Sequence, residues 1–254
     1  RRSPPWRPAP STRDRPALMD KLFCVGDEKT GTHSVAGLFR AYRAEHEPEA
    51  HDLRPLVEAR LRGDLPEGAL DRYLDGKDER LPLDVDSSFL NGEIIDVLVP
   101  RYPDARYVLT LREPRSWLDS KINQMVTYRS PRWLELRALR HGPPEGHPPE
   151  EAALAERGLP TLDGFFSEYA RFNTRVVAHV TPERLLVLRT PDIRAHADRL
   201  AAFAGVPLDA LALERLHGVA VQRRHPTDDD PLVPHGPILA HEDDRRARRR
   251  VAVV

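Results

Sequence analysis

Short apolar runs alternate with amphipathic segments along most of this chain, and this alternation restricts the possible folds more than any other feature. Strands are expected at residues 21–25, 81–86, 106–111 and 184–189. Helices are expected at residues 32–44, 54–61, 91–99, 114–128, 161–179 and 193–204. Strands that alternate with helices predict a three-layer α/β fold, in which helices flank a parallel, doubly wound sheet.

The composition of the 254 residues predicts one domain with an irregular segment at each end. We expect the domain at residues 20–218, a disordered extension rich in Pro and Arg at residues 1–19, and an irregular or disordered tail at residues 219–254. A single cysteine, Cys24, excludes a disulfide framework and a zinc site of several cysteines. No apolar stretch approaches the roughly 20 residues of a membrane-spanning helix. We therefore expect a cytoplasmic protein without a membrane partner.

The balance of charges limits the possible partners. The chain has 40 acidic and 39 basic residues, for a formal net charge of -1 at pH 7. Without a global positive field, we expect no nucleic-acid partner. The arginine-rich run at residues 245–250 is interpreted as a solvated chain end rather than a nucleic-acid-binding arm.

The turn after the first expected strand is the first candidate site, because ligands of such sheets bind beyond the carboxyl ends of the strands. Residues 26–34 (GDEKTGTHS) lead from this strand into a helix, where free backbone N–H groups favour a phosphate. Lys29 adds a point charge, and the Thr and Ser hydroxyls add hydrogen-bond donors. The alternative is an ordinary turn with Thr32 as the N-cap.

The residue order in this turn differs from that of a Walker A loop. That loop has Lys directly after its last Gly, followed by Ser or Thr, whereas here Lys29 precedes Gly31. The segment KTGTHS instead resembles the 5′-phosphosulfate loop of sulfotransferases that use 3′-phosphoadenosine 5′-phosphosulfate (PAPS). This resemblance implies a P-loop-like sulfotransferase architecture. It also implies that the 5′-phosphosulfate is bound by Lys29, Thr30, Gly31, Thr32, His33 and Ser34.

Residues 101–123 resemble the 3′-phosphate segment of the same family. The expected strand ends in Arg112-Glu113-Pro114, and Ser120 lies eight positions after Arg112. An Arg at the end of a strand can donate two hydrogen bonds to a phosphate, and a Ser hydroxyl in the following helix can approach the same anion. Taken singly, both residues also fit an ordinary protein surface. By resemblance to the family's C-terminal loop, Arg224 is a further candidate for the 3′-phosphate, although the family's following Gly is absent here.

The resemblance also suggests the catalytic residues. Lys29 would neutralise the leaving oxygen, since sulfuryl transfer, like phosphoryl transfer, needs stabilisation of the charge on the leaving group. Carbohydrate-type members use a Glu followed by Pro as the base, which matches Glu47-Pro48, eighteen residues after Lys29. The small-molecule branch uses a His, so His46 stays an alternative, as does a solvated acidic helix end. A Glu base predicts activity that stays flat down to mildly acidic pH, whereas a His base predicts a loss near pH 6.5.

The sequence therefore predicts an enzyme that transfers a sulfuryl group from PAPS to a hydroxyl of a small-molecule or carbohydrate acceptor, without a metal. A nucleotide kinase-like phosphotransferase and a non-catalytic nucleotide-binding module stay open as alternatives. The segment Asp86-Ser87-Ser88 resembles the family's substrate-side turn but also fits a helix N-cap. Tyr128, Trp133 and Leu134 are candidates for an apolar wall of the acceptor pocket, and core packing explains them equally well.

Overall fold

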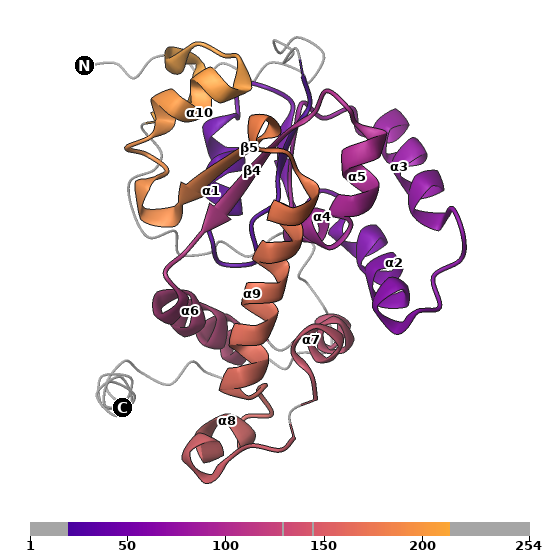
Figure 1. Ribbon diagram of the computed structural model, residues 1–254, viewed down its shortest axis with the longest axis vertical. Coiled ribbons are helices and arrows are strands. Elements are labelled where there is room, and N and C mark those ends of the chain that lie inside the picture. The colour runs from indigo at the N-terminus through magenta and orange to yellow at the C-terminus, as the bar shows by residue number, and fades with distance from the viewer. Residues whose placement is uncertain (1–19, 129, 144, 214–254) are drawn as a thin grey trace, which may run out of the picture. The chain divides into compact units, whose positions relative to one another are not determined.

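The computed structural model describes residues 20–128, 130–143 and 145–213, and within them five parallel strands form one sheet (Figure 1). The strands are β1 (Leu22–Cys24), β2 (Ala44–His46), β3 (Val85–Ser87), β4 (Arg106–Leu111) and β5 (Leu185–Arg189). Their order in the sheet is β2-β3-β1-β4-β5. Cys24 lies beside Ser87 on one side and Val108 on the other. All five carboxyl ends therefore lie at the same edge of the sheet.

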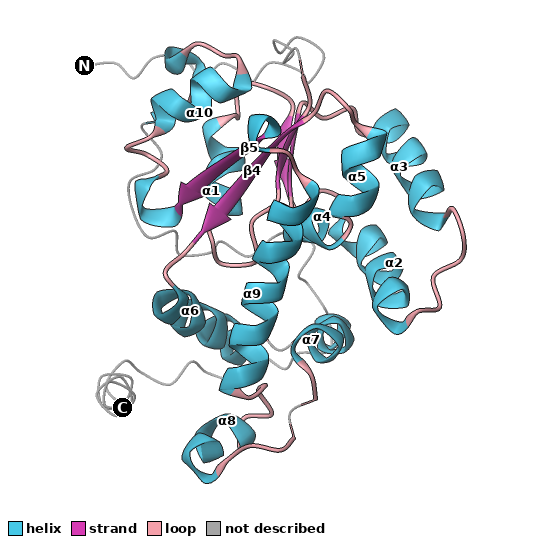
Figure 2. Ribbon diagram, in the orientation of Figure 1, coloured by secondary structure: helices cyan, strands magenta, loops and turns pink. Residues whose placement is uncertain are grey.

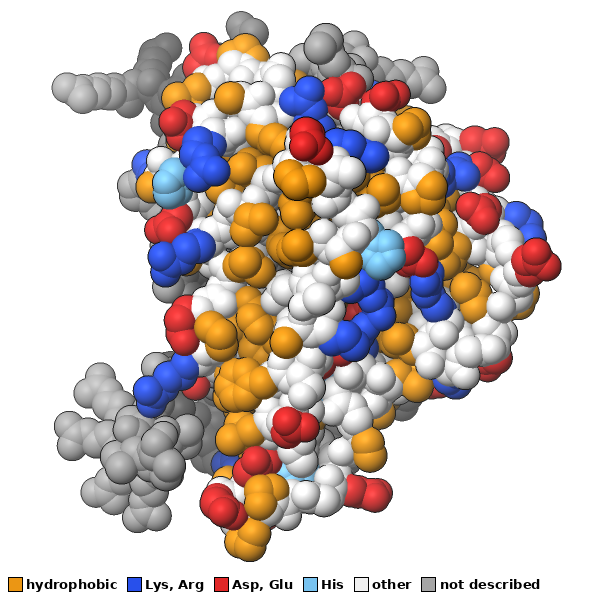
Figure 3. All heavy atoms as spheres, viewed as in Figure 1, with side chains coloured by type: hydrophobic (Ala, Val, Ile, Leu, Met, Phe, Trp, Pro, Cys, Tyr) orange, Lys and Arg blue, Asp and Glu red, His pale blue; other side chains and the backbone are white. Residues whose placement is uncertain are grey.

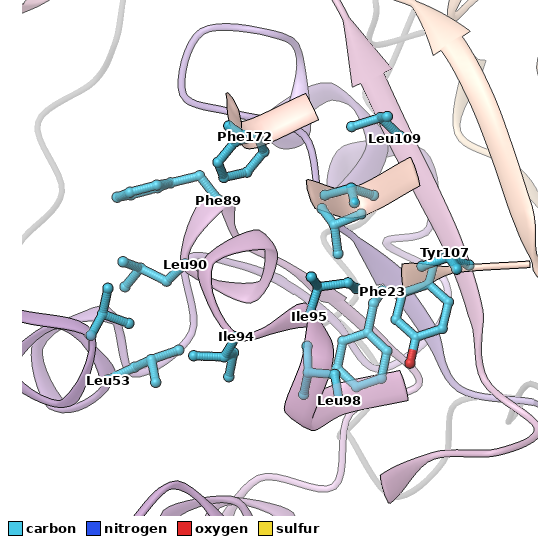
Figure 4. Close-up of a cluster of buried hydrophobic side chains, with 14 of the residues drawn as sticks. Phe23, Leu53, Phe89, Leu90, Ile94, Ile95, Leu98, Tyr107, Leu109 and Phe172 are labelled. Atoms are coloured by element: carbon cyan, nitrogen blue, oxygen red, sulfur yellow. The ribbon is translucent and has the colours of Figure 1, made fainter. Parts of the chain in front are cut away.

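Helices cover both faces of this sheet (Figure 2). On one face, α1 (Thr32–Leu38) and α10 (Ala197–Ala204) pack against strand side chains that include Leu22 and Val108. On the other face lie α2 (Ala50–Arg62), α3 (Ala69–Arg80), α4 (Phe89–Glu93), α5 (Ile95–Arg101) and α9 (Leu162–His179). There the rings of Phe23 and Tyr107 stack with 5.5 Å between their centroids (Figure 4). Because alternate strand residues point to opposite faces, both layers bury apolar surface, and the predicted three-layer α/β fold is confirmed.

A third apolar cluster lies beyond the carboxyl ends of the strands. It joins α6 (Pro114–Thr127) to α9, with the rings of Trp117 and Tyr169 stacked at 4.3 Å. The helices α7 (Leu134–His141) and α8 (Ala152–Ala155) lie in the same part of the molecule (Figure 1). Five short 3₁₀ helices complete the described elements, namely η2 (Pro131–Trp133), η3 (Pro149–Glu151), η4 (Pro182–Arg184), η5 (Thr190–Asp192) and η6 (Leu208–Ala210).

The outward side of α9 is partly apolar. Figure 3 shows apolar side chains along this helix and near the edge strand β5, where Phe166, Val177 and Val187 are exposed. The inward side of α9 carries the buried residues Phe165 and Phe172. Within the described ranges, no helix is long and apolar enough to cross a membrane.

Most expected elements are present, but one strand and three helices were missed. The helix expected at residues 32–44 ends at Leu38, and β2 forms in its place. The helices α3, α7 and α8 were not expected. The helix expected at residues 91–99 is interrupted at Ile94 between α4 and α5. The predicted boundaries at residues 19 and 219 fall outside the described residues, as do the extension and the tail, so these stay predictions.

Candidate active site

The turn at the carboxyl end of β1 is held tightly against the neighbouring segments. Gly26 fits there because a Cβ atom would lie 1.9 Å from Thr110 Oγ1 on β4. Thr30 Oγ1 donates to the Asp27 carbonyl oxygen at 2.6 Å and lies 2.8 Å from Thr110 Oγ1. Thr190, which follows β5, donates its hydroxyl to the Thr30 carbonyl oxygen at 2.5 Å. The turn is thus fixed by hydrogen bonds to two other segments of the sheet edge.

Lys29 and Gly31 give this turn its shape. Both have a positive φ, 67° for Lys29 and 108° for Gly31, and the left-handed backbone costs a non-glycine residue free energy. Arg112 Nη1 donates to the Lys29 carbonyl oxygen at 3.2 Å. Partial burial, and then the nearby Arg112 charge, lower the pKa of Lys29. The Arg112 side chain at the end of β4 therefore contacts the backbone of the turn that carries Lys29.

Arg112 is oriented by its neighbours at the end of β4. The Tyr169 hydroxyl accepts from the Arg112 backbone N–H at 2.9 Å and donates to the Arg112 carbonyl oxygen at 2.8 Å. Arg112 Nε donates to Ser116 Oγ at 3.1 Å. No carboxylate of the described residues pairs with the Arg112 guanidinium, so its charge is available to an anion. The Ser that contacts Arg112 is thus Ser116, whereas Ser120 lies one turn further along α6, partly exposed.

The start of α1 contacts the second group of candidate residues. Gly31 is the N-cap of α1 and no side chain caps it, so the interpretation of Thr32 as the N-cap was wrong. Thr32 is buried, and its hydroxyl lies 3.1 Å from His46 Nε2. His33 is exposed, and its ring meets the His46 ring edge-on at 5.1 Å. Ser34 follows in the same turn of α1 and is half-buried. This arrangement brings the predicted donor loop and the predicted base region together.

Glu47 reaches the same edge because β2 pairs with β3. Its backbone N–H donates to the Ser87 carbonyl oxygen at 2.8 Å, and its φ is 53°. Its carboxylate accepts from Ser88 Oγ at 2.5 Å and from the Phe89 backbone N–H at 3.3 Å. Oε1 lies 3.7 Å from His46 Nε2. A solvated acidic helix end, the alternative interpretation, does not describe this carboxylate, since only 25% of the side chain is exposed.

The surroundings of Glu47 favour its protonated form. Burial raises the pKa of Glu47 to about 7, although the hydrogen bonds from Ser88 and Phe89 lower it. The nearby Asp86 raises it further, while Lys77 lowers it. Glu47 is therefore a carboxylate that gains and loses a proton near neutral pH.

The segment Asp86-Ser87-Ser88 has two separate roles. Asp86 is buried and pairs with Lys77 Nζ at 2.6 Å, so it is not a free group at the rim. Ser88 is the N-cap of α4 and accepts from the Leu90 backbone N–H at 3.1 Å. The N-cap interpretation is therefore correct for Ser88. The same hydroxyl also donates to Glu47, a contact that the sequence does not reveal.

Trp133 is the one member of the predicted apolar wall that packs near Glu47. Its ring lies 6.0 Å from the ring of Phe89, whose backbone N–H binds Glu47. Tyr128 and Leu134 are exposed. No group of three or more His, Cys, Asp or Glu side chains in the described ranges is arranged to hold a metal ion. The remaining candidate, Arg224, lies outside the described residues.

Two comparisons with known proteins found a similar domain or structure. Residues 89–210, from α4 to η6, match the family model described as a sulfotransferase domain. The crystal structure of a sulfotransferase from Alicyclobacillus acidocaldarius is similar at 17% identity and a TM-score of 0.46, covering 83% of this chain and 88% of that one. No curated protein matches the chain. The part of the chain at residues 89–210, slightly less than half of it, is therefore similar to a sulfotransferase domain.

Proposed function

We propose that this enzyme transfers a sulfuryl group from PAPS to a hydroxyl of a small-molecule or carbohydrate acceptor. The observation that supports this most is the contact between Arg112, at the end of β4, and the backbone of the Lys29 turn, which follows the adjacent strand β1. Two cationic residues that follow neighbouring strands suit a donor with two separate anionic groups. The family match begins at residue 89, so the role of the Lys29 loop rests on its own geometry and on the resemblance of its sequence.

On this proposal, the two ends of the donor bind to different strands. The loop of residues 29–34 holds the 5′-phosphosulfate, and Lys29 neutralises the negative charge that develops on the leaving oxygen. Arg112 holds the 3′-phosphate, with Ser116 and Ser120 on the same helix as the nearest hydroxyl groups. Arg224 stays a candidate for the same phosphate. We propose that these contacts fix the orientation of the donor, since in-line attack is the main demand of such a transfer.

Glu47 is the residue that we assign as the base. A base works best when its pKa is close to the working pH, and a pKa of about 7 meets this condition. Ser88 and Phe89 fix the orientation of the carboxylate, which would accept the proton of the acceptor hydroxyl. His46, the alternative base, lies against Glu47 and Thr32. We propose that His46 supports this arrangement and that Glu47 takes the proton.

Transfer of radiolabelled sulfate from PAPS to a panel of alcohols, phenols and sugars tests the proposal. The matched inactive variant is Lys29→Gly, because glycine adopts the left-handed backbone of this position more easily than lysine. We expect this variant to be folded and at least as stable as the wild type, yet to lose about 10²–10³ in rate. Normal transfer by Lys29→Gly, or no binding of PAPS by the wild type, would contradict the proposal.

A further inference from the structure

The candidate donor loop contains two acidic residues, Asp27 and Glu28, directly before Lys29. Carboxylates next to an anion site repel the anion unless other charges neutralise them. Here, both of them have a cationic partner. The Glu28 carboxylate pairs with Lys121 Nζ of α6, and Asp27 Oδ1 lies 2.7 Å from Arg140 Nη2 of α7. The Asp27 and Arg140 side chains are 0% and 2% exposed, so this second pair is fully inside the protein.

Asp27 also determines the path of the loop. Its Oδ1 atom, which binds Arg140, accepts from the Glu28 backbone N–H at 2.8 Å. Its carbonyl oxygen accepts from the Thr30 hydroxyl at 2.6 Å. These hydrogen bonds hold the residues directly before and after Lys29, whose left-handed backbone conformation needs such support. A change in the orientation of the Asp27 carboxylate would therefore move the backbone that carries Lys29.

Arg140 contacts the base side of the site as well. Its Nε atom lies 2.8 Å from Glu93 Oε1, at the last residue of α4. The guanidinium carbon lies 5.2 Å from the ring centroid of Phe89, at the first residue of α4. The Phe89 backbone N–H donates to Glu47. One guanidinium thus contacts both the loop that carries Lys29 and the helix that holds the Glu47 carboxylate.

A third carboxylate completes the surroundings of Arg140. Glu168 of α9 lies 2.9 Å from Arg140 Nε, and its side chain is as buried as that of Arg140. Unlike Asp27, it has no contact with the donor loop, and it pairs also with Arg171 on its own helix. Glu168 therefore binds the guanidinium through Nε, whereas Asp27 binds it through Nη2.

We propose that Arg140 is a positioning residue of the active site. Through Asp27 it holds the loop that carries Lys29, and through α4 it holds the hydrogen-bond donors of Glu47. The alternative is a salt bridge that contributes only to folding, since removal of one partner of a buried pair is destabilising wherever the pair lies. The inference rests on the proposed function, because it assumes that the loop binds the 5′ group of the donor.

Two isosteric variants separate these possibilities. Asp27→Asn and Glu168→Gln each remove one negative charge beside Arg140, and the second is the matched control. We would measure the Kd of adenosine 3′,5′-bisphosphate by calorimetry and the Tm of each variant. Both variants should lose stability, but only Asp27→Asn should bind the nucleotide about tenfold more weakly or worse. Removal of a negative charge near an anion site would by itself tighten binding, so weaker binding identifies a change in the loop.

Adenosine 3′-monophosphate provides the second comparison, because it lacks the 5′ group. Its Kd should be little changed by Asp27→Asn. Arg140→Lys keeps the buried charge but loses the planar guanidinium group. This variant should therefore also weaken the binding of the bisphosphate more than that of the monophosphate. It serves as the test variant if Asp27→Asn does not fold.

The proposal is wrong if Asp27→Asn and Arg140→Lys bind the bisphosphate as tightly as the wild type does. It is also wrong if Glu168→Gln weakens the binding of the bisphosphate as much as Asp27→Asn does. Failure of the wild type to bind either nucleotide would instead contradict the proposed function, and the inference with it.

Discussion

The buried carboxyl group of Glu47 combines a structural cost with the chemical role that we propose for it. The sequence predicts that the pH profile separates a Glu base from a His base. The structure removes this distinction, because burial raises the pKa of Glu47 to about 7, close to the reference value of about 6.5 for histidine. We therefore expect activity to fall as the pH drops below about 7 even with Glu47 as the base, since only the deprotonated form accepts a proton.

Substitution is the measurement that separates the two candidates. Glu47→Gln keeps the size of the side chain but cannot accept the proton, so the rate of sulfuryl transfer should fall by about 10²–10⁴. His46→Gln should keep most of the activity, as well as an acid limb near pH 7. The Kd of adenosine 3′,5′-bisphosphate should be little changed in both variants. If His46→Gln is inactive and Glu47→Gln is active, the base is His46.

The raised pKa of Glu47 also predicts a pH dependence of stability. In the unfolded chain this carboxyl has its ordinary pKa of 4.5, whereas in the native state the pKa is about 7. The native state binds the proton more tightly, so the free energy of unfolding falls as the pH rises from about 4.5 through about 7. Glutamine does not ionise, so Glu47→Gln avoids this fall in the free energy of unfolding. The variant should be more stable than the wild type at pH 8, by about 1–3 kcal/mol.

Urea unfolding at pH 5 and pH 8 checks this prediction. The difference in stability between Glu47→Gln and the wild type should be larger at pH 8. An equal difference at both pH values would show that Glu47 titrates at its ordinary pKa in the native state.

At the scale of the elements, the donor loop depends on how closely β1 and β4 approach each other. A Cβ atom on Gly26 would lie 1.9 Å from Thr110 Oγ1 and 3.0 Å from the Thr110 carbonyl oxygen, and the backbone cannot move aside easily. Gly26→Ala should therefore destabilise the protein by about 1–3 kcal/mol and weaken nucleotide binding. Gly37→Ala is the control, because a Cβ atom there meets nothing within 4 Å and alanine favours the helix.

The Tm and the Kd of adenosine 3′,5′-bisphosphate are the two measurements for this pair. A Gly26→Ala variant as stable as the wild type would show that the turn after β1 is looser than its hydrogen bonds indicate. Gly37→Ala should match or exceed the wild type in Tm.

The sequence predicts those strands and helices in which the pattern of apolar side chains determines the secondary structure. Four of the six residues of β4 are apolar, and the strand lies where the sequence places it. In contrast, β2 consists of Ala, Glu and His, and it is a strand because its backbone pairs with β3. The helix α7 was not predicted because its buried side includes Arg140 and His141, and the pattern that predicts a buried helix face consists of apolar residues only.

At the scale of the whole molecule, the sequence predicts which loops meet because the topology brings them together. Lys29 and Arg112 follow two parallel strands, and these strands are neighbours in the sheet. The contacts that orient these residues could not be predicted in the same way. Ser116, Tyr169 and Arg140 come from helices whose packing decides which side chains reach the site, and no sequence spacing encodes that packing.

The two anion-binding positions that we propose, at the ends of neighbouring strands, predict how this protein would select its nucleotide. Adenosine 3′,5′-bisphosphate can occupy both the Lys29 loop and the Arg112 position, whereas ADP can occupy only the first. A hydrogen bond to a charged group is worth about 1.5–3 kcal/mol, so the bisphosphate should bind about 10–100-fold more tightly. Arg112→Met should reduce the ratio of the Kd of ADP to the Kd of the bisphosphate toward one.

Arg115→Met is the control for the loss of charge, since Arg115 is exposed on the first turn of α6. Arg115→Met removes the same formal charge as Arg112→Met, but from a residue at which we propose no donor contact. If net charge alone attracts the nucleotide, both variants should weaken the binding of the bisphosphate and of ADP equally. This effect should be larger at low salt concentration. If Arg112 reads the 3′-phosphate, only Arg112→Met lowers the ratio of the two Kd values, and the ratio responds weakly to salt. Equal affinities of the wild type for the two nucleotides would contradict the assignment of PAPS as the donor.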